Sequence, residues 1–382
     1  MRTRTLTAAA TAAATALAVA QFCITANVPA AAAATSPAPS SLAAVSCPSL
    51  TSCMAVGTTG SATIKTLAER WNGHRWTIVA TPATGAADSY LTAVSCSSAS
   101  ACTAVGYTQP GQGLAYPGTM LVERWNGSAW TMQPFPHPRG HDLSAYLMGV
   151  SCPAAAQCVA VGFYSVNGTG TGTIAAVWNG RAWWLQRFGY PGAELLGVSC
   201  ATVASCMAVG QSPGFQTAAD LWTGTWKQLE PPNPTTPVPG DGLSGVGCTS
   251  AGSLNCQAVG EYATGDSSTS TFGLGWKGAT WTSESTPSPG QHSQLPAVSC
   301  ASASACVAVG YQSVPSVGSL PLIAYWNGSG WSSQHSPLVR GDLDGVSCTT
   351  ATACTAVGLA HGGHPLIERW NGTSWSLQHP GS

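Results

Sequence analysis

The sequence predicts an all-β protein built from seven repeated units. In each unit a segment ending in Val-Ser-Cys, or a close variant, precedes a second cysteine, an Ala-Val-Gly-like strand and two tryptophans around a tight turn. The first cysteines are 49, 56, 48, 48, 52 and 48 residues apart. A period near fifty residues made of short strands and turns is typical of a β-propeller with one four-stranded blade per repeat. We therefore expect seven antiparallel blades, starting near residues 42, 91, 147, 195, 243, 295 and 343.

The seventh repeat illustrates the four strands expected in each blade, named A to D from the axis outward. Small residues suit the A and B strands, which crowd toward the axis. An Asn-Gly pair between strands C and D predicts a tight hairpin, because both residues tolerate positive φ. The expected strands are Leu343–Cys348, Cys354–Gly358, Pro365–Trp370 and Trp375–Gln378.

The cysteines predict seven local disulfides. The chain has 15 cysteines, and Cys23 lies in the leader described below, which leaves 14, or two per repeat. Zinc is disfavoured because its usual ligand spacings are missing and no histidine lies near the pairs. An exported chain with an even count favours disulfides. The expected pairs are Cys47–Cys53, Cys96–Cys102, Cys152–Cys158, Cys200–Cys206, Cys248–Cys256, Cys300–Cys306 and Cys348–Cys354.

Each repeat also carries a tryptophan pair around the C–D turn, such as Trp370 and Trp375. Two indoles beside a hairpin turn can pack across its strands and stabilise it by roughly 0.5–1.5 kcal/mol beyond area burial. Carbohydrate stacking is the alternative. Because one similar pair recurs in every blade, packing is favoured.

The N-terminal segment predicts secretion. Arg2 and Arg4 precede a weakly apolar stretch and a run of small residues, which is typical of a signal peptide over residues 1–34. Residues 35–41 form a Pro/Ser linker, and residues 42–382 the propeller. Charged residues make up only 7% of the chain and the net charge is −1, so nothing favours nucleic acid or an anionic membrane surface as a partner. Stable membrane insertion is not expected, because no segment approaches the length and apolar character of a membrane span. We expect an extracellular monomer.

Ring closure depends on how blade 7 meets blade 1, since no strand is left over for exchange. The tripeptide Glu-Arg-Trp occurs only in blades 1, 2 and 7, which are neighbours across this junction. Alternate residues of a strand point to opposite faces, so the arginine of one blade can meet the glutamate of the next. The alternative, which we weigh equally, is that these are three solvated glutamate–arginine pairs on the outer edge that contribute little to stability.

Function is expected on the face that carries the B–C loops and the D–A connectors, because these vary in length while the A–B and C–D turns do not. Tyrosines and acids gather in these segments. They suit adaptable recognition, although packing at the loop bases is the alternative. The candidate ligand-binding residues are Tyr107, Tyr116, Asp142, Tyr164, Asp241, Tyr262, Tyr311, Asp342 and His361.

The repeat resembles that of secreted proteins common in actinobacteria, mostly without an assigned function, over residues 42–382. Its C–D turn is similar to the Asp-box hairpin of sialidase-like propellers, but Trp-Asn-Gly-x-x-Trp stands where that box has its aspartate. The catalytic arginines of sialidases have no motif here to match, so sialidase activity is not implied. Propeller lectins bind sugars between blades with sets of polar and aromatic residues that repeat from blade to blade. The loops of this chain do not repeat in that way, which argues against a symmetric multivalent lectin.

These observations predict a propeller that binds a protein or a glycan on its variable loops, with no cofactor, metal or catalytic residue assigned. Familiar catalytic signatures are missing from the sequence. The alternative is a secreted hydrolase or lyase acting on polysaccharide, with Asp142, Asp241 and Asp342 near the axial opening.

Overall fold

The computed structural model describes residues 38–381, except 87, 112–117, 139–142, 167–169, 187–191, 215, 235–241, 251–252, 266–267 and 338–339. The signal peptide expected over residues 1–34 lies outside this part of the chain, as do Tyr116, Asp142 and Asp241. The described residues form 28 strands, and none of them belongs to a helix that could span a membrane.

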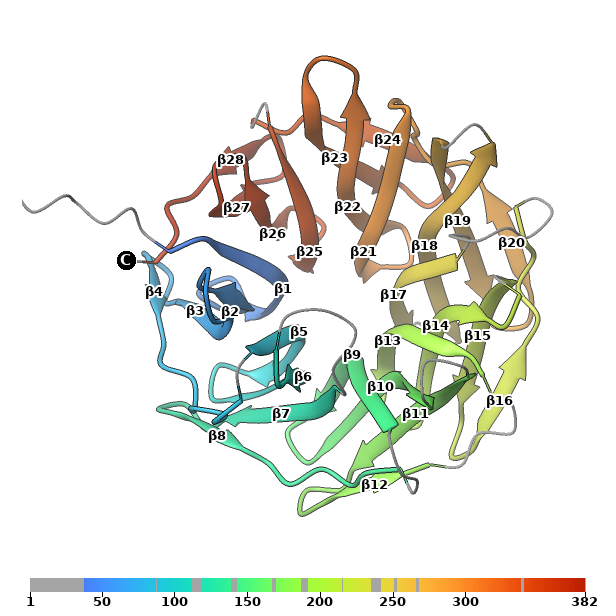
Figure 1. Ribbon diagram of the computed structural model, residues 1–382. Helices are drawn as coiled ribbons and strands as arrows, with labels where there is room; N and C mark the ends of the chain where they lie inside the picture. Colours follow the sequence, from blue (N-terminus) through green and yellow to red (C-terminus); the bar gives the residue numbers. More distant parts are fainter. Residues whose placement is uncertain are drawn as a thin grey trace, which may run out of the picture. The chain divides into compact units, whose positions relative to one another are not determined.

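The 28 strands form seven four-stranded antiparallel blades that follow one another in a ring (Figure 1). The A strands surround the centre: β1 (Ser40–Ser49), β5 (Asp88–Ser98), β9 (Leu143–Ala154), β13 (Glu194–Thr202), β17 (Gly242–Ser250), β21 (His292–Ser302) and β25 (Gly341–Thr350). The B strands follow: β2 (Ser52–Thr59), β6 (Ala101–Gln109), β10 (Gln157–Val166), β14 (Ser205–Ser212), β18 (Leu254–Gly265), β22 (Ala305–Val314) and β26 (Ala353–Ala360).

The outer half of each blade is a short hairpin. The C strands are β3 (Lys65–Trp71), β7 (Thr119–Trp125), β11 (Gly170–Trp178), β15 (Gln216–Trp222), β19 (Ser268–Lys277), β23 (Gly318–Trp326) and β27 (His364–Trp370). The D strands are β4 (Trp76–Ile78), β8 (Trp130–Met132), β12 (Trp183–Leu185), β16 (Trp226–Leu229), β20 (Trp281–Glu284), β24 (Trp331–Gln334) and β28 (Trp375–Leu377). A single parallel bridge, Thr269 to His292, links the sheets of blades 5 and 6. The predicted all-β fold is confirmed.

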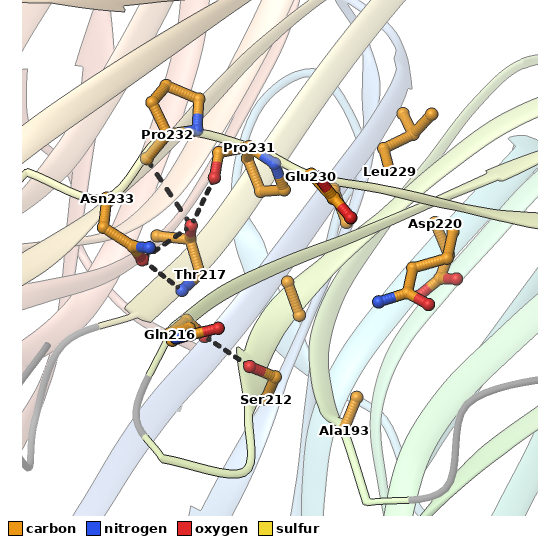
Figure 2. A pocket seen from close by; sticks show the side chains of 13 residues that line it. Ala193, Ser212, Gln216, Thr217, Asp220, Leu229, Glu230, Pro231, Pro232 and Asn233 are labelled. Atoms are coloured by element: carbon orange, nitrogen blue, oxygen red, sulfur yellow. Dashed lines mark hydrogen bonds between the residues drawn. The ribbon is translucent and has the colours of Figure 1, made fainter.

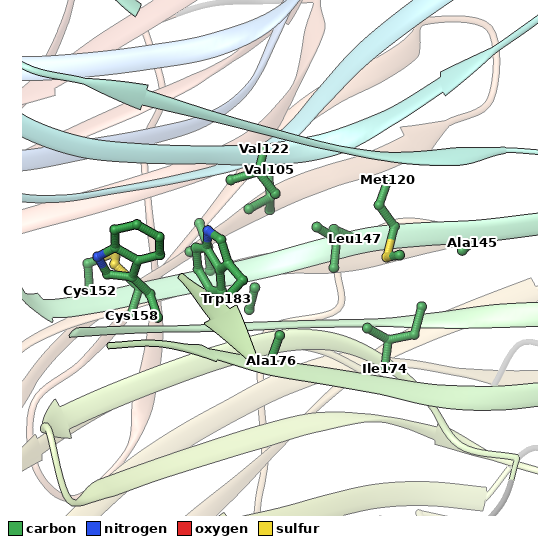
Figure 3. Packing of buried hydrophobic residues seen from close by; sticks show 13 residues of the cluster. Val105, Met120, Val122, Ala145, Leu147, Cys152, Cys158, Ile174, Ala176 and Trp183 are labelled. Carbon is green, nitrogen blue, oxygen red and sulfur yellow. A yellow bond between two sulfur atoms is a disulfide. The ribbon is translucent and has the colours of Figure 1, made fainter. Parts of the chain in front are cut away.

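The hydrophobic core lies between neighbouring blades. Each A strand contributes one leucine that is at most 1% exposed, such as Leu147 in blade 3. Figure 3 shows Leu147 and Ile174 of blade 3 beside Met120 and Val122 of blade 2. Because each blade buries its faces only against its neighbours, the stability of the ring depends on all seven junctions.

The recurring glycine of Ala-Val-Gly marks a close approach of two backbones. In blade 7 the A strand has a register shift between Leu343 and Gly345, opposite Gly358. A Cβ atom on Gly358 would lie 2.0 Å from the carbonyl oxygen of Asp342. The equivalent glycines of the other blades meet the same obstacle at 1.9–2.0 Å. Glycine is therefore required where the A strand bulges toward the B strand.

All seven predicted disulfides are present, each between the A and B strands of one blade. The seven tryptophan pairs also pack as expected, with ring centroids 5.3–5.9 Å apart. Most of these indoles are buried, which supports structural packing over carbohydrate stacking.

The serine of Val-Ser-Cys joins six of the seven blades to the next. Its Oγ accepts a hydrogen bond of 2.9–3.0 Å from the backbone N–H of the first cysteine in the following blade. The pairs are Ser46 with Cys96, Ser95 with Cys152, Ser151 with Cys200, Ser199 with Cys248, Ser299 with Cys348, and Ser347 with Cys47. Blade 5 has Gly247 at this position and lacks the hydroxyl. The last pair shows that the closing junction uses the same contact as the others.

Neither expectation for Glu-Arg-Trp was right. The glutamates Glu69, Glu123 and Glu368 are at most 1% exposed, so they are not solvated surface groups. The arginine that follows each of them stacks on the first tryptophan of the next blade instead of pairing with a glutamate. The distances from guanidinium carbon to ring centroid are 5.9 Å for Arg70 on Trp125, 4.5 Å for Arg124 on Trp178 and 4.8 Å for Arg369 on Trp71. Cation–π contacts thus join these blades, the closing junction included.

The C-terminal tail completes the closure. After β28 the chain reaches the outer strands of blade 1, where the N–H of Gly381 donates a 2.6 Å hydrogen bond to Oε2 of Glu69. Figure 1 shows the C-terminus beside β4. In blade 7, Glu368 receives a comparable 2.7 Å bond from Ser336, in the connector that leaves blade 6. The tail therefore occupies the place that a D–A connector takes between other blades.

Candidate functional site

The B–C loops and D–A connectors lie together on one face of the ring, which we call the loop face. Backbone hydrogen bonds join them: His361 N–H donates to the Arg340 carbonyl, and Ser89 N–H to the Ile64 carbonyl. The side chain of Asp88, the first residue of β5, also accepts a 2.8 Å bond from the N–H of Ile64. These contacts fix the variable segments against a rigid scaffold.

A cavity of about 370 Å³ opens on the loop face where blade 6 meets blade 7, and we call it the blade 6–7 cavity. It brings together two of the residues singled out from the sequence, Asp342 and His361. Its lining residues are Val317, Gly318, Ser319, Arg340, Gly341, Asp342, Leu359, Ala360, His361, Gly362 and Gly363. Arg340 and His361 are exposed, and Asp342 is half-buried, so a ligand can reach all three.

Asp342 is held in place by Ser319, whose hydroxyl donates a short hydrogen bond to Oδ1 of the carboxylate. The turn that precedes Ser319 contains Ser316 at φ 68°, which is a left-handed conformation that non-glycine residues seldom adopt. Such local strain is often found beside ligand sites. Guanidinium, imidazole and carboxylate groups around one cavity supply both donors and acceptors for a polar ligand.

Acidic side chains of the two neighbouring blades, 5 and 7, lie near Tyr311 on β22 of blade 6. Burial raises the pKa of Tyr311, and the charges of Glu261, Asp342 and Asp344 raise it further. Burial raises the pKa of Asp344 to about 6, with a further contribution from Asp342. Burial likewise raises the pKa of Glu261 to about 7, although a hydrogen bond with the Gln294 side chain opposes this. Among the described residues, no three His, Cys, Asp or Glu side chains are placed to hold a metal ion.

Three of the remaining candidate tyrosines take part in packing. Tyr107 stacks on Tyr90 with ring centroids 4.8 Å apart, and meets Tyr146 of blade 3 edge-on at 5.0 Å. The ring of Tyr164 covers Gly172 on the paired strand, where a Cβ would lie 2.1 Å from it. Tyr262 contacts Phe272 edge-on at 6.0 Å. Their rings lie on strands, not at the tips of loops.

Ser319, Arg340 and Asp344 were missed by the sequence reasoning. Asp344 had a visible signal, because Gly-Asp-Leu-Asp-Gly places it two residues after Asp342 on the same strand. Ser319 and Arg340 had none, since their proximity to Asp342 depends on how the loop of blade 6 meets the connector of blade 7.

The chain matches no protein-family model and no curated protein. Among solved structures it is similar to the WD40 β-propeller domain of Doa1 (11% identity, TM-score 0.49, 88% of this chain and 93% of that chain). It is also similar to SapL1 lectin in complex with α-methyl fucoside (16%, TM-score 0.49, 78% and 96%) and to a six-bladed lectin of Aleuria aurantia (15%, TM-score 0.46, 89% and 95%). At these identities the likeness concerns the fold alone.

Proposed function

We propose that this chain is an extracellular, monomeric binding protein whose loop face holds a protein or a glycan. The observation that carries the proposal is the blade 6–7 cavity, where Asp342, His361 and Arg340 converge from a B–C loop and a D–A connector. Rigid blades that present variable loops are a common arrangement for recognition. Seven disulfides suit an oxidising compartment.

The double variant Asp342→Asn/His361→Ala should lose ligand capture by tenfold or more while keeping the wild-type unfolding temperature. The reason is that both side chains line the cavity and neither belongs to the buried core. Capture is measured on a glycan array and by pull-down from culture filtrate.

The matched control is Asn126→Asp/Asn327→Asp on the opposite face. Asn126 and Asn327 each accept two backbone hydrogen bonds through Oδ1 in their turns, and aspartate keeps that acceptor. Equal loss of capture in both double variants would show that the loop face is not the binding face.

The carboxylates beside the cavity favour one second candidate, a polysaccharide hydrolase. Burial raises the pKa of Asp344 to about 6, and Asp342 lies two residues before it on the same strand. A pair of carboxyl groups is what glycoside hydrolysis needs as acid and base. If the protein is such an enzyme, it should release reducing ends from a polysaccharide panel, and Asp344→Asn should lower the rate at least a hundredfold. Absence of any release by the wild-type protein would leave binding as the function.

A further inference from the structure

A second and larger cavity lies in blade 4, away from the blade 6–7 cavity. Its volume is about 590 Å³, within the usual range for small-molecule sites. The wall is formed by β15, β16 and the segment that follows them (Figure 2). Its polar lining includes Gln216, Thr217, Asp220, Gln228, Glu230 and Asn233.

Asp220 provides an unpaired carboxyl group inside this cavity. The residue is only 5% exposed, and no hydrogen bond joins its side chain to a residue that the structure describes. Burial raises the pKa of Asp220 to about 6, so the group is still mainly ionised at neutral pH. An ionised carboxylate that is buried without a partner is costly. A ligand that donates hydrogen bonds would remove this cost.

Of the three glutamates at the equivalent position in other blades, two receive a hydrogen bond, whereas neither oxygen of the third, Glu123 of blade 2, has a partner among the described residues. Asp220 lies two residues before the first tryptophan of its pair, as Glu69 and Glu368 do in blades 1 and 7. Glu69 accepts a bond from Gly381 and Glu368 accepts one from Ser336, each from the segment arriving out of the preceding blade. Aspartate is one methylene shorter, and in blade 4 the carboxyl group faces a cavity instead of a protein donor.

The rest of the lining mixes donors with acceptors. Oδ1 of Asn233 accepts bonds from the N–H and the hydroxyl of Thr217 at 2.8 and 3.0 Å, which leaves the Asn233 NH₂ as a donor. Gln228 stands directly opposite Asp220 on the paired strand and is exposed at the mouth. A cation would need acceptors only, whereas each sugar hydroxyl both donates and accepts. Glu230 at the mouth disfavours anionic ligands.

We propose that the blade 4 cavity binds a neutral saccharide, with Asp220 accepting from sugar hydroxyls and the amides of Gln228 and Asn233 donating to its oxygens. The apolar edge formed by Leu229 and the two prolines after Glu230 faces the less polar side of the sugar ring. This site is separate from the blade 6–7 cavity and does not depend on the function proposed there.

The test is a glycan array carrying neutral and acidic saccharides, followed by calorimetric titration of the strongest neutral binder. Asp220→Asn keeps the shape but loses the charge, and should weaken binding tenfold or more. Asn126→Asp, in a turn on the opposite face where aspartate keeps the acceptor, is the matched control and should bind this saccharide as the wild type does. Asp342→Asn is measured beside it to separate the two cavities. Should Asp220→Asn fail to fold, Gln228→Ala changes only an exposed side chain and should weaken binding several-fold.

Three outcomes would overturn the proposal: no neutral saccharide binds, Asp220→Asn binds as well as the wild type, or basic peptides bind the cavity in preference to sugars. If saccharide binding is lost with Asp342→Asn but kept with Asp220→Asn, the blade 6–7 cavity is the sugar site and the blade 4 assignment fails. The two proposals therefore fail separately.

Discussion

Deleting residues 375–382 should open the ring between blades 7 and 1 and lower the unfolding temperature by about 5 °C or more. The deletion removes β28, whose Trp375 is 5% exposed and donates a 2.8 Å hydrogen bond to Gln334 of blade 6. It also removes Gly381 and leaves Glu69 buried without its donor. Differential scanning calorimetry and limited proteolysis measure the effect, and far-UV circular dichroism should show that most β structure persists.

Leu377→Ser is the matched control for this deletion, because Leu377 lies on the same strand but is 49% exposed. It should leave the unfolding temperature within about 1 °C of wild type. Ser347→Ala tests the closing contact more narrowly, since it leaves the N–H of Cys47 without its partner. If the deletion unfolds the protein no more readily than Leu377→Ser does, then the tail and β28 contribute little to closure.

The sequence predicted what lies within a blade and not what joins two blades. Disulfides, tryptophan pairs and strands all follow from residues close together in the chain, and each was confirmed. The serine of Val-Ser-Cys was visible beside the first cysteine of every repeat but one, yet its partner is about fifty residues away. The burial of Glu123 was likewise hidden, because strand alternation separates two faces without showing which of them the next blade covers.

The candidate site shows the same division. Asp342 and His361 were selected from one face and do line one cavity. Tyr107 was selected by the same argument, but its ring packs against Tyr90 of the paired strand and Tyr146 of the next blade. Asp220 could have been found by aligning the repeats, since Asp-Leu-Trp occupies the place of Glu-Arg-Trp. What no alignment of repeats shows is that a cavity lies beside it.

Replacing Glu123 with leucine should stabilise the protein, and should do so more at pH 9 than at pH 5. Glu123 is fully buried on β7, and neither carboxyl oxygen has a hydrogen-bond partner in the described part of the chain. Burial raises its pKa from 4.5 to about 8. Leu274 fills the equivalent position in blade 5 and is 1% exposed, so the fold already accepts leucine there.

The direction in which Glu123 changes stability with pH follows from proton uptake on folding. Between pH 4.5 and about 8 the unfolded chain has an ionised Glu123, while the folded chain keeps it protonated. Folding therefore binds a proton in this window, and the free energy of unfolding falls as the pH rises through it. Above about pH 8 the folded chain holds a buried charge and the loss is complete. Glu123→Leu removes this loss, which is on the order of a few kcal/mol.

Denaturant unfolding of wild type and Glu123→Leu at pH 5, 7 and 9 measures the effect, with the exposed Glu230→Gln as the control. The unfolding free energy of the Glu123→Leu variant should still fall as the pH rises, because burial also raises the pKa of Glu368 to about 7. What distinguishes Glu123 is the difference in unfolding free energy between the two proteins, which should widen from pH 5 to about pH 8 and then level off. A difference that stays constant with pH would mean that Glu123 does not titrate in this window. The buried carboxyl would then be paired or solvated in the folded protein.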